Sequence, residues 1–419
     1  MKRYNYGIKR ESPAIAGKQP KQYPWLGDDK HCDVCVTGGG LTGAMCALSA
    51  AEAGLSVVLI TSDAIGYGDT GHLTGCARFD AGRTLAELDR FITVDEALTL
   101  YSMGFDALDG LQNLCARLDR DCKKAGIASG FERRDLLVFT DNPTQLELME
   151  REYLAIRKRF PDSTWITRKN AESSFAFPIS GGILTKEGSA VLNPYGLAHL
   201  CVMKAEELGA EIFEQTEAID IQTPRTEEGC VIIRTSTHRT IYADRLVVAS
   251  GSKGMRILPA RVRFHTLFAV VGQLPENAAG WPGKCALGTF GRRSENCIIS
   301  SGGRLAASCV HRSGKLKSFF KNADETSNYS ELNGFTKTIL PELAGATFKY
   351  QYSYSFVSPS DGLPVIGTHD DCKNCFFGLP GLYQDSGTPV FSYVASQIAE
   401  KYLTDSLPKN NPLFDPMRL

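Results

Sequence analysis

The sequence predicts an α/β protein with a Rossmann-like nucleotide-binding domain and a second, antiparallel-sheet α+β domain. Three observations predict this fold. A βαβ pattern opens near His31, a second α-to-β passage over 193–251 ends in an apolar strand, and residues 261–345 alternate strands with Gly-rich turns and show little helix before about 330. Because 419 residues exceed what one hydrophobic core usually organises, we expect two cores.

The βαβ unit consists of a strand over 33–37, a glycine cluster, a helix from about 41 to 53 and a strand over 56–60. The cluster has the pattern GxGxxG, formed by Gly38, Gly40 and Gly43. In this pattern the first glycine permits a tight turn, the second lets the backbone approach a pyrophosphate, and the third allows the helix to pack closely on the strand. The helix N-terminus adds N–H groups and a positive dipole, so we expect a dinucleotide here.

The remaining elements follow from local patterns. Apolar residues at helical spacing predict helices within 84–125 and 143–160. Asn193-Pro194 opens a predicted helix that ends near 208, strands follow over 210–212, 230–234 and 244–251, and the last helix covers about 390–402. The nucleotide-binding domain is therefore expected to combine 31–120, 185–260 and 346–419, and the second domain to combine 121–184 and 261–345.

The N-terminal residues 1–30 are expected to form an extended arm. Pro13, Pro20 and Pro24 prevent regular structure there, and Trp25 is expected to dock on the body of the protein.

Composition excludes several classes of function. Hydrophobic residues make up 43% and charged residues 22%, as in ordinary globular proteins. The 46 Lys and Arg residues balance 47 Asp and Glu residues, so nucleic acid is not an expected partner. No stretch approaches about 18 uninterrupted apolar residues, and the N-terminus has no apolar signal core, so we expect no transmembrane segment and a cytoplasmic location. The oligomeric state stays open.

The cysteine pattern favours a reducing compartment, because the 13 cysteines are scattered rather than gathered into a disulfide framework. Two CxxC pairs, Cys32/Cys35 and Cys372/Cys375, have a spacing that zinc and redox dithiol sites use. Alternation along the first predicted strand sends Cys32 and Cys35 to opposite faces, so we expect no metal site. The chain also lacks the GxSxG and HExxH patterns of hydrolases and zinc enzymes.

Several dispersed motifs share one order with a known family. They are DVCVTGGGLTG (33–43), AIGYGDTGH (64–72), LVVASG (246–251), DGLPVIG (361–367) and NPLFDP (411–416). Together they resemble the D-amino-acid oxidase superfamily, particularly its glycine oxidase, sarcosine oxidase and γ-glutamylputrescine oxidase-like branches. The resemblance covers most of the chain from residue 30 onward. It implies FAD as cofactor, a substrate domain lying over the flavin, and oxidation of a C–N bond in a small amine or amino-acid substrate by hydride transfer to flavin N5.

The resemblance also implies which residues contact FAD. They lie in the glycine turn, after the second strand, in the stretch expected to run beneath the flavin, and before the last helix. The expected contacts are Gly38, Gly39, Gly40, Leu41, Thr42, Gly43, Thr61, Ser62, Gly68, Asp69, Thr70, Gly71, His72, Leu73, Thr74, Ala218, Ala249, Gly251, Gly381, Leu382, Gly387 and Thr388.

Two departures from the family pattern affect the cofactor. Thr61 stands where such folds normally place an acidic ribose ligand, which predicts weaker nucleotide affinity unless Asp63 reaches the ribose instead of bonding its own backbone. The segment 381–389 replaces the family's Gly-Gly-Asn-Gly turn. It is expected to face the pyrimidine edge of the flavin and to tune its potential.

His72 ends a run that resembles the Gly-Ser-Thr-x-His run of sarcosine and dimethylglycine dehydrogenases, whose histidine bonds covalently to the flavin. Related oxidases carry Arg or His there without a covalent link. We expect His72 to contact the cofactor, and both covalent and non-covalent attachment stay open.

Five residues are candidates for the catalytic site because they fall in segments expected to roof the flavin: Arg78, His265, Arg304, Tyr352 and Tyr354. Tyr352 stands where the family has a tryptophan ahead of the DGLP segment. A guanidinium could clamp a substrate carboxylate, and a phenol or neutral imidazole could orient an amine. The alternatives are a solvated arginine and aromatic rings that only pack on their neighbours.

Two other functions fit the same fold. One is a different flavin-dependent reaction, such as oxidation of a hydroxy acid or reduction of an unsaturated substrate. The other is a flavin-binding protein without turnover, which the departures at Thr61 and 381–389 motivate.

Overall fold

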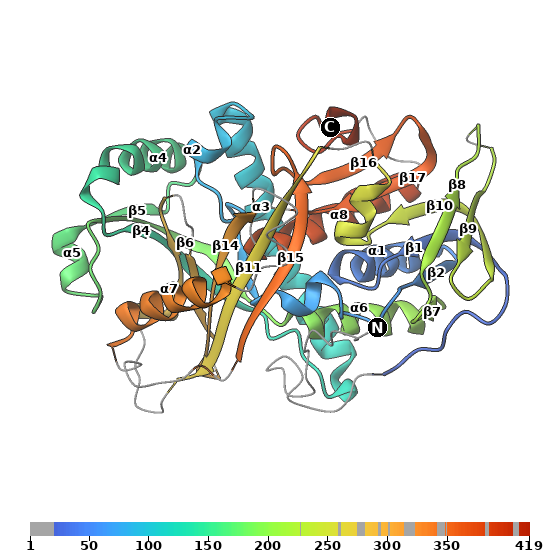
Figure 1. The fold of residues 1–419 in the computed structure, drawn as a ribbon, viewed down its shortest axis with the longest axis horizontal. Coiled ribbons are helices and arrows are strands. Elements are labelled where there is room, and N and C mark those ends of the chain that lie inside the picture. The colour runs from blue at the N-terminus through green and yellow to red at the C-terminus, as the bar shows by residue number, and fades with distance from the viewer. Residues whose placement is uncertain are drawn as a thin grey trace.

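Two β-sheets placed side by side organise the computed structural model of the protein (Figure 1). The structure describes residues 21–226, 228–258, 261–274, 281–291, 295–300, 302–313, 323–341, 348, 350–381, 385–404 and 410–419. The fold class expected from the sequence, a Rossmann-like α/β unit with a second, mainly antiparallel sheet, is confirmed.

The first sheet contains the βαβ unit. Its strands are β1 (Lys30–Thr37), β2 (Val57–Ile60), β7 (Glu211–Phe213), β10 (Thr240–Val248), β16 (Val365–His369) and β17 (Cys372–Leu379), in the order β16-β17-β10-β1-β2-β7. All neighbours are parallel except β16, which runs antiparallel to β17. The antiparallel strands β8 (Ala218–Gln222) and β9 (Val231–Thr235) branch from β10. The parallel core places the carboxyl ends of β1, β2 and β10 along one edge, where α/β proteins bind ligands.

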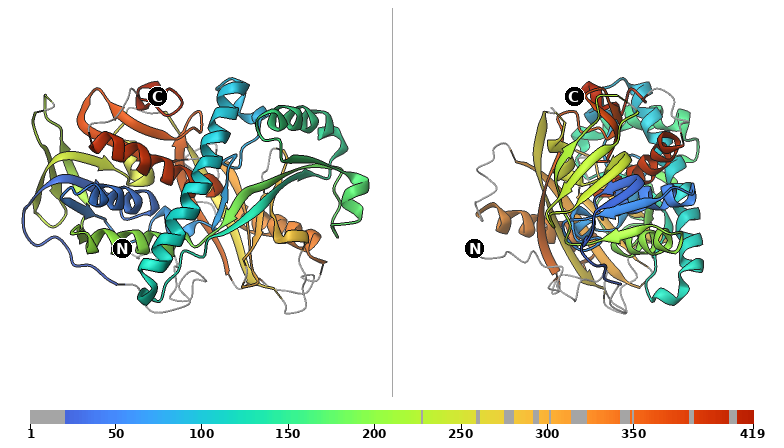
Figure 2. Two further views of the ribbon diagram at one scale, coloured as in Figure 1. Left: turned by 180° about the vertical axis from the view of Figure 1, so that it is seen from behind. Right: turned by 90° about the vertical axis from the view of Figure 1, so that its right-hand side faces the viewer.

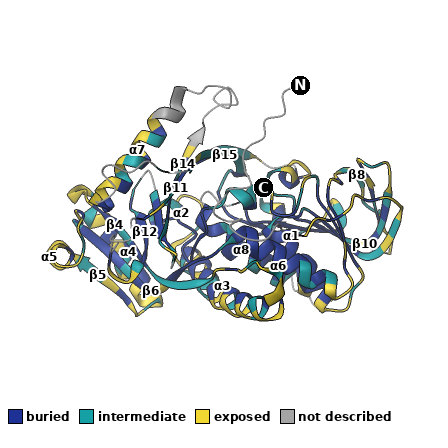
Figure 3. Ribbon diagram, turned by 90° about the horizontal axis from the view of Figure 1, so that it is seen from below, coloured by how far each residue is buried: buried dark blue, intermediate teal, exposed yellow. Residues whose placement is uncertain are grey.

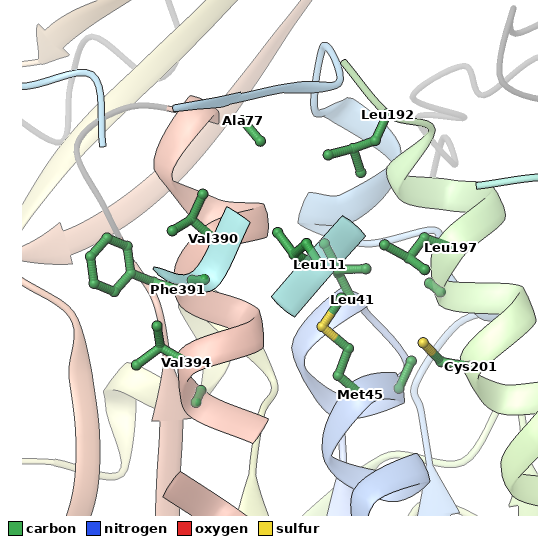
Figure 4. Close-up of a cluster of buried hydrophobic side chains, with 14 of the residues drawn as sticks. Leu41, Met45, Ala77, Leu111, Leu192, Leu197, Cys201, Val390, Phe391 and Val394 are labelled. Atoms are coloured by element: carbon green, nitrogen blue, oxygen red, sulfur yellow. The ribbon is translucent and has the colours of Figure 1, made fainter. Parts of the chain in front are cut away.

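Helices cover one face of this sheet. α1 (Leu41–Glu52) packs between α8 (Thr388–Leu403) and α6 (Pro194–Glu207), and every α1 residue except the last is buried. Figure 4 shows Leu41 and Met45 of α1 between Val390 and Val394 of α8 on one side and Leu197 and Cys201 of α6 on the other. The small side chains of α1 allow this close approach.

The second sheet is larger and mainly antiparallel. Its strands are β3 (Cys76–Arg78), β4 (Glu132–Thr140), β5 (Ser163–Thr167), β6 (Gly181–Val191), β11 (Val262–Gln273), β12 (Ala286–Thr289), β13 (Glu295–Ile299), β14 (Arg304–Ser313) and β15 (Tyr350–Pro359). The order is β15-β11-β14-β13-β12-β4-β6-β3, with β5 beside β6, and only β12 and β4 are parallel neighbours.

Several helices pack around the second sheet. They are α2 (Leu85–Leu88), α3 (Val94–Asp121), α4 (Leu146–Arg159), α5 (Arg168–Glu172) and α7 (Ala323–Ile339), and short 3₁₀ turns cover Lys123–Ala125, Pro143–Gln145, Pro282–Lys284 and Pro416–Arg418. The long helix α3 runs along the junction of the two sheets (Figure 2) and contacts α6 and α8 on one side and β6 on the other. One hydrophobic cluster joins α7 to the outer face of β11 and β14, whereas Val271, Ala306 and Tyr352 of the opposite face pack on the main core. Figure 3 shows that buried residues dominate the helices α1, α6 and α8.

Some expectations from the sequence need correction. Trp25 does not dock, because its side chain is 69% exposed, whereas Tyr23 and Leu26 are buried. The backbone N–H groups of Tyr23 and Leu26 donate to Glu214 and Thr216, which turns their own side chains inward. The helix expected near 330 begins at Ala323, seven residues earlier than expected.

Strand membership departs from the expected domain bounds in three places. β3, the part of β6 beyond residue 184, and β15 all belong to the second sheet. The division into domains stays a prediction. Among the residues that the structure describes, no helix is long and apolar enough to cross a membrane, and no group of three or more His, Cys, Asp or Glu residues is placed to hold a metal ion.

Candidate active site

A cavity of about 980 Å³ lies where the carboxyl ends of the parallel strands face the second sheet. Its walls come from the β1–α1 turn, the end of β2, the turn η2 (Asp69–His72), the β7–β8 loop, the turn η5 (Gly251–Arg256), β15 and the start of α8. Segments that are far apart in the sequence therefore build one long site.

The glycine turn is shaped by close backbone packing. Gly38 has φ of +118°, and a Cβ there would lie 2.4 Å from the carbonyl oxygen of Ala249. A Cβ on Gly43 would lie 1.8 Å from the carbonyl oxygen of Gly38. A Cβ on Gly40, in contrast, would meet only the Thr70 hydroxyl at 3.0 Å, and Gly40 lines the cavity. Two of the three glycines thus serve the packing of the turn, and Gly40 leaves room in the cavity.

The N-terminus of α1 is suited to bind phosphate. Gly40 provides no side-chain cap, and the first turn of α1 has no acidic residue. The Leu41 N–H donates to the Thr70 hydroxyl at 2.8 Å, which ties the helix start to η2. Lys253 and Arg256 line the same cavity and add positive charge. Backbone N–H groups, the helix dipole and these cations together fit a pyrophosphate.

A carboxylate from a distant segment reaches the end of β2. The carbonyl of Thr61 accepts a hydrogen bond from the Thr216 N–H at 2.8 Å, which brings Glu217 beside Thr61 and Ser62. Lys253 donates to the Glu217 carboxylate at 2.7 Å and to the Ser62 hydroxyl at 3.1 Å. The sequence analysis missed Glu217, because only the adjacency of β2 and β7 places it here. Asp63, the residue weighed for this position, also lines the cavity.

Asp69, His72 and Tyr354 form a cluster on the cavity wall, where Asp69 also lies against Gly251 and Ser252 of η5. The Tyr354 hydroxyl donates to the Asp69 carboxylate, and the Tyr354 ring stacks on the His72 ring with centroids 4.2 Å apart. His72 Nδ1 lies 3.0 Å from the Gly68 carbonyl oxygen. Burial raises the pKa of Asp69 and lowers the pKa of His72. The cluster therefore presents a neutral imidazole beside a carboxyl group at neutral pH.

Asp385 is a second carboxyl group on the cavity wall; it is buried, and it was not predicted from the sequence. It lies in the turn η9 (Asp385–Gly387), immediately before α8. The hydroxyl of Thr74 donates to its Oδ2 at 2.5 Å, and the Ser308 hydroxyl lies 3.4 Å from both carboxylate oxygens. Burial raises the pKa of Asp385, and these hydrogen bonds lower it. The raised pKa makes this group a candidate for proton transfer.

Most residues expected to contact FAD line this cavity. They are Gly38, Gly39, Gly40, Leu41, Thr42, Thr61, Ser62, Gly68, Asp69, Thr70, His72, Leu73, Ala218, Ala249, Gly251, Gly381 and Thr388. Gly43, Gly71, Thr74 and Gly387 do not line it, and Leu382 lies outside the described residues, as do the other two residues of the segment 382–384. Gly43 packs on Gly38, and Thr74 supports Asp385 from behind. Their contact with FAD stays a prediction.

Tyr354 alone of the five candidate catalytic residues lines the cavity. The buried guanidinium of Arg78 donates twice to Asp80, at 2.9 and 2.6 Å, and once to Asn296. Burial lowers the pKa of Arg78, and pairing with Asp80 outweighs that effect and raises it, so the guanidinium is engaged within the sheet and its role toward a substrate stays a prediction.

The other three candidates lie behind or beside the cavity wall. His265 is buried, and its Nε2 lies 2.8 Å from the Ser358 hydroxyl. The Tyr352 hydroxyl donates to the His72 carbonyl at 3.0 Å, so this residue supports the Asp69–Tyr354 cluster. Arg304 begins β14, where burial lowers its pKa.

Comparisons with known proteins agree with this geometry. The DAO family profile, described as FAD dependent oxidoreductase, matches residues 33–388. The probable oxidoreductase OrdL of Haemophilus influenzae is 26% identical over 250 residues, covering 58% of this chain and 54% of that protein. The γ-glutamylputrescine oxidoreductase of Escherichia coli is 27% identical over 228 residues, covering 52% and 51%. The chain thus spans about half the length of the curated relatives it matches.

Solved structures share the whole fold. Glycine oxidase from Geobacillus kaustophilus has a TM-score of 0.76 at 18% identity and covers 93% of this chain and 99% of its own. L-amino acid deaminase from Proteus vulgaris has a TM-score of 0.74 at 13% identity and covers 96% and 100%. A long cavity with a glycine cradle at a helix N-terminus fits an extended dinucleotide. With the family profile matching most of its length, the chain belongs to the DAO family of FAD-dependent oxidoreductases, and FAD is its cofactor.

Proposed function

We propose that this enzyme oxidises the C–N bond of a small amine or amino acid. The observation that carries the proposal is a pair of carboxyl groups on the cavity wall, the partly buried Asp69 and the buried Asp385, where the second sheet covers the cofactor site. Such groups suit a substrate that binds as a cation and must lose a proton before oxidation. Similar proteins include glycine oxidase and γ-glutamylputrescine oxidoreductase, which supports the same class of substrate.

FAD, when bound, would supply a two-electron acceptor for the hydride that leaves the carbon beside the nitrogen. The chain's own residues hold the cofactor and shape the space beside it. We propose that the α1 N-terminus holds the pyrophosphate and that Glu217, whose carboxylate accepts from Lys253, holds the ribose, all through residues that line the cavity. The other cavity-lining residues named above are proposed as further FAD contacts.

The second sheet excludes water from the reacting end. Leu267 and Phe356 place apolar side chains on the cavity wall beside Tyr354. Removing water there strengthens the interaction between a charged amine and a buried carboxylate. The hydrogen bonds of Tyr354 and Tyr352 to η2 hold the two walls in register.

Anaerobic reduction of the FAD-loaded enzyme tests the proposal. The panel contains glycine, sarcosine, L-proline, L-phenylalanine and γ-glutamylputrescine, with lactate and glycolate as hydroxy-acid controls. We expect at least one amine or amino acid to bleach the visible flavin absorbance and to release an aldehyde, a keto acid or a cyclic imine. Bleaching by the hydroxy acids alone would assign a different redox reaction, and no bleaching with intact FAD would point to a protein without turnover.

A further inference from the structure

We propose that Asp385 binds the nitrogen of the substrate as an ammonium ion and accepts the proton that this nitrogen must lose before oxidation. The inference rests on the proposed function and deepens it. It names the recognition element of the site and states that the enzyme selects the protonated amine.

The position of Asp385 favours a role toward the substrate. Its side chain is 5% exposed and lines the cavity, and its partner Ser308 belongs to β14 of the second sheet. Ser308 lies in a row of paired residues that crosses four strands: Tyr352 of β15, Ala269 of β11, Ser308 itself and Asn296 of β13. Paired residues on neighbouring strands point to the same face of a sheet. Asp385 therefore sits at the face of the sheet that covers the cofactor site.

The hydrogen-bond partners of Asp385 leave its charge uncompensated. They are the hydroxyl and N–H of Thr74, at 2.5 and 3.3 Å, the Ser308 hydroxyl at 3.4 Å, and the backbone N–H of Ser386. Each of these donors is neutral. Among the described residues, no cation forms an ion pair with Asp385, and Arg78, the arginine of neighbouring β3, is already paired with Asp80. A buried carboxylate that has donors but no counter-ion is completed by a cationic ligand.

The adjacent Ser386 adds a second polar group without a partner. Its side chain is fully buried, and its hydroxyl makes no hydrogen bond within the described residues. A buried hydroxyl in this state is rare in folded proteins, because its desolvation is not repaid by a hydrogen bond. Asp385 and Ser386 therefore form a short polar segment whose hydrogen-bonding capacity the described residues do not exhaust.

The titratable neighbours of Asp385 do not compete for the proton. Cys76 and Arg78 come from β3, Asp80 follows that strand, and Tyr352 comes from β15. Burial raises the pKa of the Cys76 thiol and of the Tyr352 phenol, so both stay neutral through neutral pH. Arg78 and Asp80 form a closed ion pair. Asp69 and His72 line the same cavity and also have shifted pKa values, so a titration seen in ligand binding is assigned to Asp385 by its loss in Asp385→Asn.

The proton balance of the step is simple. One N–H bond of the substrate ammonium breaks, an O–H bond forms on an Asp385 carboxylate oxygen, and the nitrogen keeps the electron pair. FAD, when bound, would accept the hydride of the neighbouring C–H bond, and the lone pair would then form the C=N bond. Asp385 returns its proton to solvent after the imine departs. A carboxyl group with a raised pKa performs this transfer better than an ordinary aspartate, because its proton affinity lies closer to the working pH.

Three ligands of one shape test the proposal on the FAD-loaded enzyme: tert-butylammonium, tert-butanol and pivalate. None can be oxidised at the carbon beside the functional group, because that carbon has no hydrogen, and binding is measured from the change in the flavin spectrum. We expect the wild type to prefer tert-butylammonium. Asp385→Asn should weaken ammonium binding by roughly 10- to 100-fold, the worth of a charge-assisted hydrogen bond, while tert-butanol binding changes little. Asp370→Asn, an equal charge change at an exposed residue, should behave as the wild type.

The pH dependence provides a second readout that a structural role would not move. Ammonium affinity should fall as pH drops and Asp385 takes up a proton. This acidic limb of the plot of affinity against pH should vanish in Asp385→Asn. Thr74→Val keeps the shape of the side chain and removes the hydrogen bond that lowers the pKa of Asp385, so the limb should move to higher pH. This second variant decides the matter if Asp385→Asn does not fold.

Equal weakening of all three ligands in Asp385→Asn, or an unmoved limb in Thr74→Val, would overturn the inference. The result is separable from the test of the proposed function. If amines bleach the flavin but Asp385→Asn keeps its ammonium affinity, the inference alone fails. If the ammonium preference depends on Asp385 but no amine bleaches the flavin, the proposed oxidation fails. The proton-accepting role of Asp385 then fails as well, and its ammonium binding stands.

Discussion

Gly40→Val should abolish FAD binding and leave the apoprotein as stable as the wild type. Gly40 has an ordinary φ of −80°, so a side chain causes no backbone strain. Only the Thr70 hydroxyl, at 3.0 Å, lies within 4 Å of its Cβ position, and a shift of a few tenths of an ångström relieves this contact while keeping the hydrogen bond from the Leu41 N–H. The valine methyl groups would instead fill the part of the cavity next to the α1 N-terminus, where the pyrophosphate is proposed to bind.

Gly43→Ala is the matched control with the opposite pattern. Its Cβ would lie 1.8 Å from the Gly38 carbonyl oxygen, so the strand–helix turn must shift in the apoprotein itself. Overpacking of this kind costs about 1–3 kcal/mol or more. Gly40→Val should lose only the stabilisation that FAD adds, which is about 2.7 kcal/mol when free FAD is at about 100 times its dissociation constant.

Urea unfolding with and without FAD separates the two variants, and quenching of flavin fluorescence reports binding. Wild type and Gly43→Ala are compared at equal FAD saturation. The reasoning is refuted if Gly40→Val binds FAD as the wild type does, or if it destabilises the apoprotein as much as Gly43→Ala.

Three further expectations concern single side chains. Burial raises the pKa of Glu152 to about 8. The folded state therefore holds a proton that the unfolded state has released, so stability is greatest below the ordinary pKa of 4.5 and falls by at most about 1.4 kcal/mol per pH unit up to pH 8. Glu152→Gln should flatten this slope in urea unfolding. His72→Ala should weaken FAD binding, and acid precipitation of the wild type should leave free flavin in the supernatant; flavin in the pellet, with a mass increase that His72→Ala removes, would show a covalent bond. Glu217→Ala should lower FAD affinity by about tenfold, the worth of a hydrogen bond to a charged group, and unchanged affinity would leave the ribose to Thr61 or Asp63.

The elements that follow local patterns were predictable from the sequence. The βαβ unit was predicted because a short apolar strand, GxGxxG and a helix rich in small residues follow one another directly in the sequence. Each of these signals depends only on nearby residues. The mainly antiparallel second sheet was predicted because strands alternate with Gly-rich turns over 261–345. Its extent was underestimated, because β3 and β15 sit next to segments of the first sheet in sequence and join the second sheet only through long-range pairing.

The site was predictable where it is made of backbone and less so where it depends on side-chain partners. Arg78 has the right residue type and segment for a substrate clamp, but its guanidinium forms an ion pair with Asp80, two residues later. The Arg-x-Asp spacing was a signal that could have weakened the assignment. Asp385 lies in the segment 381–389, where the chain departs from the family pattern, and Glu217 lies in no motif that carries the resemblance, so the resemblance could not name either residue. Their roles depend on which strands and turns meet in three dimensions.

The meeting of the two sheets explains why these side chains matter together. Hydrogen bonds that cross from the second sheet to the cofactor side include Tyr354 to Asp69, Tyr352 to the His72 carbonyl, Ser308 to Asp385, and the Val357 N–H to the Ser252 hydroxyl. Two of them end on a carboxyl group, Asp69 or Asp385, whose pKa is raised by desolvation. A substrate cation entering between the sheets would favour the ionised form of either carboxyl, while any loosening of the sheets would admit water and favour it as well. Proton affinity at the reacting end is therefore set by how tightly the second sheet closes over the first, which couples substrate recognition to the packing of the whole molecule.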